Sequence, residues 1–310
     1  MRLGVVIANQ VGWASGERIL RLAVAADEAG FSSVWVADHI VMPATFHSAY
    51  PMGSIQGFDP KEQETFFEPL VTLAYVASHT HSVRLGTSIL VPTLRHPAYL
   101  AKLVATLDNL SQGRVVLGVG AGWLQEEFDA LGVACFHRRG EMLDEHIAVM
   151  RLLWSEEVAS FEGRYYRLPA VRCAPHPWAS HGPPIWIGGA SSAALRRVAA
   201  LGDGWQPMAL GPEQLRKPIE KLHRLLDAAG RDPGAVAVCP RCDVAVGEYS
   251  AARKPNGIYG GSEEVAAGIR AYEAAGCTDL ILDLLPEESF EGRLETLGRL
   301  ANEVLPLVAP

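Results

Sequence analysis

Short runs of β-branched and apolar residues alternate with longer amphipathic stretches along the whole sequence, and eight such pairs can be counted. The first pair is a predicted strand at residues 3–8 and a predicted helix at residues 17–30, with Ser15 placed to cap the helix and Gly30 placed to end it. Strand-then-helix repeats are typical of parallel βαβ units. Eight of them predict an α/β fold of the (β/α)8 TIM-barrel type, with an open doubly wound sheet as the structural competitor.

The other units follow the same rhythm. Further strands are expected at residues 33–37, 83–88, 115–119, 184–188, 204–208, 236–246 and 278–285. Further helices are expected at residues 68–80, 97–111, 138–154, 191–201, 212–229, 262–275 and 289–308. Inserted loops are expected after strands 2, 4 and 7, the first at residues 38–65 and the second at residues 155–182. Because no linker divides the chain, one barrel domain over residues 1–310 is expected.

Charge and hydropathy exclude several classes of function. The formal net charge is −8 and Lys and Arg are dispersed among acidic residues, so no basic stripe is present to bind a nucleic-acid backbone. No uninterrupted apolar run reaches the ~18 residues of a membrane span. Residues 1–7 lead into a strand and do not resemble a signal peptide. A cytoplasmic protein with a small-molecule partner is therefore expected, without nucleic-acid or membrane partners.

The five cysteines are odd in number and irregularly placed, which favours reduced thiols over a disulfide framework. Cys239 and Cys242, together with Cys173 and His176, could supply four zinc ligands. However, residues three apart on a strand point to opposite faces, and Pro240 lies between the two thiols. Buried or edge thiols are the simpler interpretation, and no metal site is expected.

Asp38 and His39 follow the second predicted strand, at the end of a barrel strand where catalytic groups sit. A histidine can exchange a proton with a reacting carbonyl or alcohol near neutral pH, and the adjacent carboxylate could bias it. The competing interpretation is that the pair only satisfies backbone groups at the strand end.

Three further strand ends have small residues. Residues 86–97 after the third strand are rich in hydroxyl residues and prolines, and Gly118, Gly120 and Gly122 end the fourth strand, where a ligand could approach the backbone. These three glycines do not form the glycine-rich fingerprint of a dinucleotide-binding site, because the glycine on the helix side and the acidic residue about 20 positions later are missing. Residues 185–192 join a strand directly to a helix start, whose N–H groups could bind a phosphate.

With these segments identified, the chain resembles the luciferase-like monooxygenase superfamily, and within it the branch that uses the deazaflavin coenzyme F420. The resemblance covers nearly the whole chain and is carried by five ordered motifs. They are SSVWVADH at 32–39, LGTSILVP at 85–92, GRVVLGVGAG at 113–122, PIWIGG at 184–189 and LGDGW at 201–205.

The resemblance implies a (β/α)8 barrel whose cofactor ring lies against a bulge made by a non-proline cis peptide after strand three, here Ser88-Ile89. It implies that Asp38 and His39 lie by the ring and that His39 serves proton exchange. It also implies backbone contacts to the cofactor from two segments. These are Gly120, Ala121 and Gly122 beside the ring or its tail, and Gly188, Gly189 and Ala190 around the ribityl and phosphate portion.

The chain departs from the branch at one position. Sugar-phosphate dehydrogenases of this branch have a glutamate immediately after the strand-four glycines, where this chain has Trp123. Glu126 and Glu127 follow on the next expected helix and could substitute only if the turn bends inward. An apolar or aromatic substrate pocket is expected instead, with ordinary loop packing as the alternative. Its expected lining is Trp13, Trp123, Phe46, Tyr50, Phe58 and Phe66.

The expected function is an F420-dependent oxidoreductase that transfers a hydride between the deazaflavin and a small, apolar substrate while His39 handles the proton. One alternative is an FMN-dependent monooxygenase that takes reduced flavin from a separate reductase; a reductase for F420 is the equivalent partner. A second alternative is a non-catalytic flavin-binding barrel. A homodimer is expected through the apolar faces at residues 70–77 and 98–105.

Overall fold

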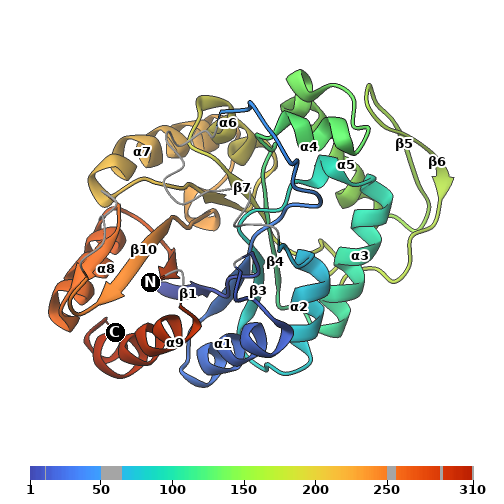
Figure 1. The fold of residues 1–310 in the computed structure, drawn as a ribbon. Coiled ribbons are helices and arrows are strands. Elements are labelled where there is room, and N and C mark those ends of the chain that lie inside the picture. Colours follow the sequence, from blue (N-terminus) through green and yellow to red (C-terminus); the bar gives the residue numbers. More distant parts are fainter. Residues whose placement is uncertain (11, 50–64, 250–255, 287–288, 309–310) are drawn as a thin grey trace.

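The computed structural model describes residues 1–10, 12–49, 65–249, 256–286 and 289–308. Within these ranges, the main sheet is parallel and curls around the centre of the molecule (Figure 1). Its ten strands lie in the order β11-β10-β12-β1-β2-β3-β4-β7-β8-β9. Their bounds are β1 (Arg2–Val6), β2 (Ser33–Val36), β3 (Arg84–Thr87), β4 (Val115–Val119), β7 (Ile185–Gly188), β8 (Gly204–Gln206), β9 (Ala237–Val238), β10 (Arg241–Val246), β11 (Ile258–Gly260) and β12 (Asp279–Leu284).

The segment at residues 237–246 bonds to strands from both ends of this order. The Cys239 N–H donates to Trp205 O in β8 at 2.8 Å, and the Ile281 N–H of β12 donates to Pro240 O at 2.9 Å. A single strand is expected here, but the structure has β9 and β10 with two residues between them. The reason is Pro240, which has no N–H to continue the ladder.

The helices lie outside the curled sheet (Figure 1). Their bounds are α1 (Gly16–Glu28), α2 (Pro69–Ala77), α3 (Pro97–Leu110), α4 (Gln125–Ala130), α5 (Arg139–Ser155), α6 (Ser192–Leu201), α7 (Pro212–Ala228), α8 (Ser262–Ala274), α9 (Phe290–Arg299) and α10 (Leu305–Val308). A π-helical turn at residues 300–304 joins α9 to α10. Among the described residues, no helix is both long and apolar enough to cross a membrane.

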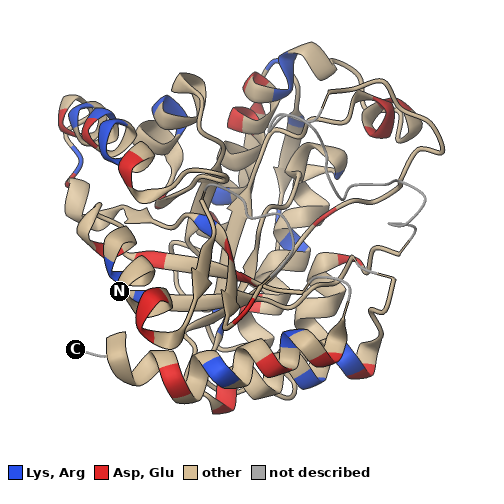
Figure 2. Ribbon diagram, turned by 60° about the vertical axis from the view of Figure 1, so that its left-hand side comes forward, with Lys and Arg blue, Asp and Glu red and all other residues tan. Residues whose placement is uncertain are grey.

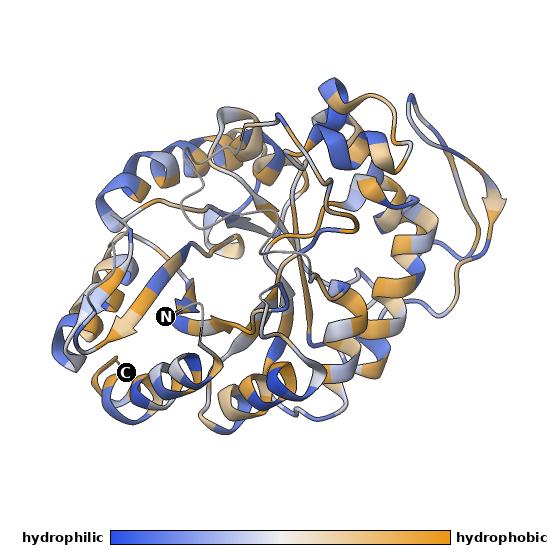
Figure 3. Cartoon of the chain, viewed as in Figure 1, coloured by the Kyte–Doolittle hydropathy of each residue, from blue (hydrophilic) through white to orange (hydrophobic). Residues whose placement is uncertain are grey.

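The first helix shows why these stretches fold as they do. Ser15 Oγ accepts a hydrogen bond from the Arg18 N–H at 3.3 Å, which confirms the predicted cap. The buried side of α1 consists of Ile19, Leu22, Ala23 and Ala26. The same division into apolar and polar stripes is visible along the outer helices (Figure 3), and acidic and basic residues are interspersed on them (Figure 2).

The expected insertion at residues 155–182 contains structure of its own. Strands β5 (Ala159–Glu162) and β6 (Arg167–Val171) form an antiparallel hairpin beside α5 (Figure 1). Glu145 of α5 accepts hydrogen bonds from the Tyr165 N–H at 2.8 Å and the Tyr166 N–H at 3.2 Å. The hairpin is hard to predict because its strands are short and largely exposed, so they lack an alternating apolar pattern.

Two tryptophans fill the interior of the curled sheet. Trp35 pairs with Gly86 across β2 and β3, and Trp186 pairs with Gly204 across β7 and β8. Paired residues of a parallel sheet share a face, so each indole lies over a glycine. A Cβ on Gly86 would be 2.1 Å from Trp35 Cε3, and a Cβ on Gly204 would be 2.5 Å from Trp186 Cδ1. The ring centroids are 5.4 Å apart, and this layer supports the strand ends above it.

Candidate active site

Four neighbouring parallel strands end close together and carry the motifs that the sequence singles out. Asp38 and His39 follow β2, Ser88 and Ile89 follow β3, and Gly120 follows β4, while Gly188 ends β7. The Ser88–Ile89 peptide bond is cis, as the resemblance implies. The Leu90 N–H donates to Gly118 O at 2.8 Å and the Gly120 N–H donates to Leu90 O at 2.9 Å, which ties the segment after the cis bond to β4.

The glycines at these strand ends accommodate the Ile89 side chain. A Cβ on Gly120 would lie 2.0 Å from Ile89 Cδ1, and a Cβ on Gly188 would lie 2.8 Å from the same atom. The motifs of β3, β4 and β7 are therefore parts of one packed unit. Ile89 is half-buried, so one side of this bulge remains exposed at the carboxyl end of the sheet.

The Asp38 carboxylate is buried and is held by three donors. Arg95 donates to both of its oxygens at 2.8 Å, and the Val91 N–H donates to Oδ2 at 2.9 Å. Arg95 also donates to Glu68, the N-cap residue of α2, at 3.0 Å. Burial opposes the charge of Arg95, but its hydrogen bonds to Asp38 raise the pKa of the guanidinium. Asp38 thus fixes the end of β2 relative to the segment that follows the cis bond.

His39 is half-buried, and its ring is held by a carboxylate from α4. His39 Nδ1 lies 2.8 Å from Glu127 Oε2. The second oxygen of Glu127 accepts from the Ile40 N–H at 2.7 Å and the Val41 N–H at 3.3 Å. The turn after β4 does bend inward, so Glu127 reaches the strand-two histidine from the helix on which the sequence places it.

Glu126 holds a later part of the same loop. It accepts from the His47 N–H at 2.6 Å and from Ser48 Oγ at 2.6 Å. Although burial opposes the shift, hydrogen bonds from Ser48 and His47 lower the pKa of Glu126 to about 2. The two consecutive carboxylates of α4 therefore order the segment from His39 to Ser48.

Aromatic rings surround His39. Phe66 lies 5.0 Å and Trp123 lies 6.2 Å from the imidazole, measured between ring centroids, and both meet it edge to face. Phe46 lies 5.9 Å from Trp123. Trp13 has a different neighbourhood, because its ring packs 5.5 Å from Phe290. Two other residues expected in the pocket, Tyr50 and Phe58, lie outside the described residues.

A charged group inside the sheet has no counterpart in the sequence predictions. Arg241 of β10 donates to Ser88 O at 3.3 Å, on the cis peptide, and forms an ion pair with Asp283 of β12. Arg293 of α9 donates to the same Asp283 at 3.2 Å. The available sequence signal is a charged residue at a core-facing position within an apolar strand, as at Arg241 and Asp283. Ser88 Oγ and the Gln206 amide are buried with no hydrogen-bond partner among the described residues.

The start of α6 lies beyond β7. Gly189 has a φ of 101°, a region that favours glycine, and Ala190 and Ser192 are exposed. Ser191 caps the helix by accepting from the Ala194 N–H at 3.1 Å. Lys221 of α7 donates to Ser192 Oγ at 2.7 Å. A positive helix end and a cation therefore occur together at this turn.

The thiols of Cys239 and Cys242 are buried, and burial raises the pKa of both. Over the residues described, no group of three or more His, Cys, Asp or Glu side chains is arranged to hold a metal ion.

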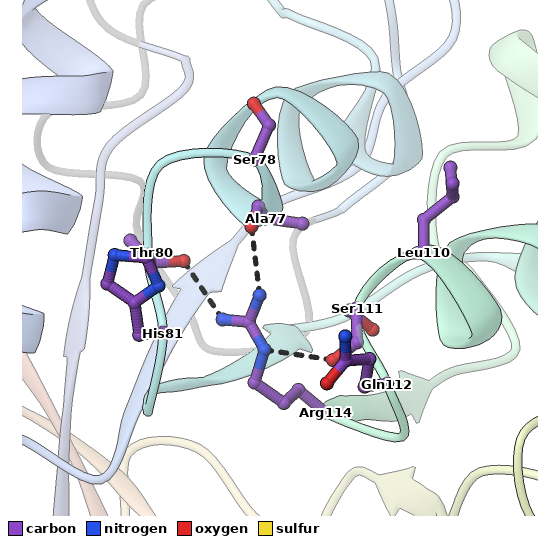
Figure 4. A pocket seen from close by; sticks show the side chains of 8 residues that line it. All are labelled: Ala77, Ser78, Thr80, His81, Leu110, Ser111, Gln112 and Arg114. Atoms are coloured by element: carbon purple, nitrogen blue, oxygen red, sulfur yellow. Dashed lines mark hydrogen bonds between the residues drawn. The ribbon is translucent and has the colours of Figure 1, made fainter.

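A pocket of about 260 Å³ lies at the opposite ends of the strands, before β3 and β4. Its central cation, Arg114, donates to Ala77 O at 2.9 Å, Thr80 Oγ1 at 3.0 Å and Ser111 O at 3.0 Å (Figure 4). Arg114 therefore satisfies groups at the ends of α2 and α3. The pocket therefore lies at the other ends of the strands from His39.

Known proteins resemble the chain over most of its length. The F420-dependent glucose-6-phosphate dehydrogenase of Kineococcus radiotolerans is 34% identical over 227 residues, which are 71% of this chain and 61% of that protein. The F420-dependent hydroxymycolic acid dehydrogenase of Mycobacterium tuberculosis is 31% identical over 254 residues, 81% of this chain and 65% of that protein. The solved structure of the monooxygenase RslO1 from Streptomyces bottropensis superposes with a TM-score of 0.83 and 26% identity, covering 100% of both chains.

The model of one family, described as luciferase-like monooxygenase, matches residues 1–256. This range includes the ends of β2, β3, β4 and β7 and the cis Ser88–Ile89 bond. The chain therefore belongs to the luciferase-like monooxygenase family and is an oxidoreductase.

Proposed function

We propose that this protein is a coenzyme F420-dependent oxidoreductase that transfers a hydride between the deazaflavin and a small, apolar organic substrate. The observation that carries the proposal is the His39 imidazole, held by Glu127 at the carboxyl ends of the strands that also present the Ser88–Ile89 bulge. The two dehydrogenases that are 31–34% identical are both F420-dependent, which supports the choice of cofactor.

The residues present fit a flat, phosphate-bearing cofactor. The half-buried Ile89, packed over Gly120 and Gly188, offers an apolar surface for a ring, and Ala121 and Gly122 continue beside it. The exposed turn at Gly189 and Ala190, with Lys221 beside the start of α6, suits the ribityl and phosphate portion. Ser88 Oγ is a buried polar atom that can turn toward a ring substituent.

His39 has the catalytic part and Asp38 a positioning part in this proposal. F420, when bound, would supply or accept the hydride. When an alcohol is oxidised, His39 takes the hydroxyl proton as the hydride leaves carbon; in the reverse direction it returns the proton to the carbonyl oxygen. Asp38 is occupied by Arg95 and Val91, so it shapes the bulge and does not exchange protons itself.

The substrate pocket is proposed to lie on the aromatic side of His39. Phe46, Phe66 and Trp123 present apolar edges there, and Trp123 stands where sugar-phosphate dehydrogenases of this branch have a glutamate. An apolar alcohol or ketone suits this lining better than a sugar phosphate. Trp13 is expected at the far rim, because it packs on Phe290.

The second candidate is an FMN-dependent monooxygenase that receives reduced flavin from a separate reductase. The observation in its favour is the similarity to the monooxygenase RslO1 over the full length of both chains. The two candidates differ in chemistry, because a deazaflavin has carbon in place of the N5 of flavin and reacts poorly with oxygen.

The test is an anaerobic titration of the apoprotein with oxidised and reduced F420 and with FMN and its reduced form, followed by fluorescence. We expect tight binding of F420 and weak binding of FMN; the reverse would establish the monooxygenase. In the loaded enzyme, His39→Ala should lower kcat by about 10²- to 10⁴-fold with little change in cofactor affinity. An unchanged kcat would reject the catalytic part of His39, and no turnover of any alcohol or ketone would favour a non-catalytic binding protein.

We also propose the assembly around this site. If β9 and β10 are counted as one strand, the barrel has eight strands, the other seven being β1, β2, β3, β4, β7, β8 and β12. Residues 1–310 would then form one (β/α)8 barrel with insertions after β2, β4 and β10. Val71 and Tyr75 on α2 and Tyr99 on α3 are exposed apolar residues that would meet in a homodimer. We expect the dimer to sediment at twice the 33.4 kDa monomer mass. We also propose that the protein is located in the cytoplasm.

A further inference from the structure

We infer that Glu127 is the positioning residue of the active site, and that it makes Nε2 of His39 the atom that exchanges the proton. The inference rests on the proposed function and deepens it. It concerns a carboxylate on α4, eight residues after β4 ends at Val119, and Trp123 lies in the turn between them. The carboxylate that reaches His39 therefore comes from the helix α4 and not from the end of a strand.

One oxygen of the Glu127 carboxylate contacts the His39 ring, and the other contacts the backbone next to it. Oε2 lies 2.8 Å from His39 Nδ1, and Oε1 accepts from the Ile40 N–H at 2.7 Å. The carboxylate is therefore held by the backbone of the residue that follows His39, and it holds the imidazole in turn. The side chain of Glu127 is 2% exposed and that of His39 is 12% exposed, so water does not compete strongly for this hydrogen bond.

Two neighbouring aromatic rings also contact the imidazole. Phe66 and Trp123 meet it edge to face, with interplanar angles of 72° and 86°. The hydrogen bond at Nδ1 and the aromatic packing both help to fix the ring. Such orientation of a catalytic histidine by a carboxylate that does not itself react is a general device in enzymes.

The hydrogen bond also selects the tautomer. An ionised carboxylate can only accept, so the hydrogen between Glu127 and His39 belongs to Nδ1. Neutral His39 then has its basic lone pair on Nε2, across the ring from α4. A substrate hydroxyl can give its proton to Nε2 as its hydride leaves, and the resulting imidazolium retains Glu127 as its counter-charge.

Glu126 provides a matched control on the same turn of α4. It is also a carboxylate, and it also binds the loop after β2, through His47 and Ser48. No hydrogen bond joins it to His39 among the described contacts. Replacing Glu126 tests the effect of a lost charge and a loosened loop, and replacing Glu127 adds the effect on the imidazole.

The experiment compares Glu127→Gln with Glu126→Gln. Glutamine keeps an oxygen for the Ile40 N–H, and its amide can donate to an unprotonated Nδ1. Long-range ¹H–¹⁵N correlation spectra of the apoprotein, with His39 assigned by its loss in His39→Ala, report the tautomer. We expect the Nδ1–H tautomer in the wild type and in Glu126→Gln, and a shift toward Nε2–H in Glu127→Gln.

In the loaded enzyme, Glu127→Gln should lower kcat about 10- to 100-fold while KM and cofactor affinity stay near wild-type values.

Two outcomes would overturn the inference. One is a Glu127→Gln variant with the wild-type tautomer and the wild-type kcat. The other is an equal loss of kcat in both variants, which would assign the effect to the loop. Failure of the proposed function is distinguishable, because a wild type that binds neither form of F420 would disprove that function while the tautomer spectra could still be read.

Discussion

At the scale of single residues, Asp38 and His39 show what a motif leaves out. The sequence predicts that both lie at the end of β2, and the structure places them there. Their partners are Arg95, 57 positions after Asp38, and Glu127, 88 positions after His39. Those separations are closed by folding, so no local pattern could predict that the two neighbours are bound to different elements. Whether His39 is catalytic stays a prediction for the kinetic test.

The Asp38–Arg95 pair yields a prediction about stability. Asp38→Asn should lower the free energy of unfolding by about 3–5 kcal/mol, because it leaves the guanidinium of Arg95 buried without its main counter-charge. Glu68→Gln removes the other, partly exposed carboxylate from the same guanidinium and should cost less than about 1 kcal/mol. Urea unfolding of the two variants and the wild type measures both effects. Equal losses would show that Asp38 is no more important to the fold than Glu68.

At the scale of elements, most regular strands and helices are predictable, but the inserted hairpin and the short strand β11 (Ile258–Gly260) are not. Periodicity predicts α1 with its cap because its apolar residues recur on one side. The β5–β6 hairpin is instead held by contacts with α5, including the 3.2 Å contact between His146 Nδ1 and the Tyr166 hydroxyl. Contacts of this kind depend on which helix lies beside the insertion.

His146 makes this junction sensitive to acid. Burial, then the charges of His96 and Arg95, lower the pKa of His146 from 6.5 to about 3. Between these values the unfolded chain binds a proton that the folded protein does not, so stability is present above pH 6.5 and is lost as the pH falls toward 3.

Replacement of His146 should therefore flatten the acid limb of the stability curve. The wild type should lose up to about 1.4 kcal/mol per pH unit through this one group, and His146→Gln should lack that contribution. Urea midpoints measured from pH 7 to pH 4 give the slope. The exposed His137 provides the control for removal of a histidine. An unaltered slope in His146→Gln would mean that His146 is accessible to protons in the folded protein.

At the scale of the whole molecule, the curled sheet is organised by its interior. The alternation of segments predicts an α/β fold, but it does not predict which residues face inward. The register does so, by placing Trp35 on Gly86 and Trp186 on Gly204. The strand interruption at Pro240 likewise depends on its place between β8 and β12.

The interlocked pair of Trp35 and Gly86 can be tested by a double-mutant cycle. Gly86→Ala should cost at least about 1–3 kcal/mol, because the new methyl would overlap the indole. In a Trp35→Leu background the same change should cost less, with a coupling energy of about 0.5–3 kcal/mol. Gly298→Ala in α9 is the control, since a Cβ there meets nothing within 4 Å. Additive costs at positions 35 and 86 would show that the two residues do not share the space.

The coupling between Trp35 and Gly86 affects the order in which substitutions can accumulate during the evolution of this protein. At positions 35 and 86 the order of substitutions matters, because a side chain gained at the glycine costs less after the indole has been replaced by something smaller. The same order holds for positions 186 and 204. Descendants of this chain would therefore tend to retain both glycines until the tryptophans are lost, because a substitution made first at a glycine is destabilising.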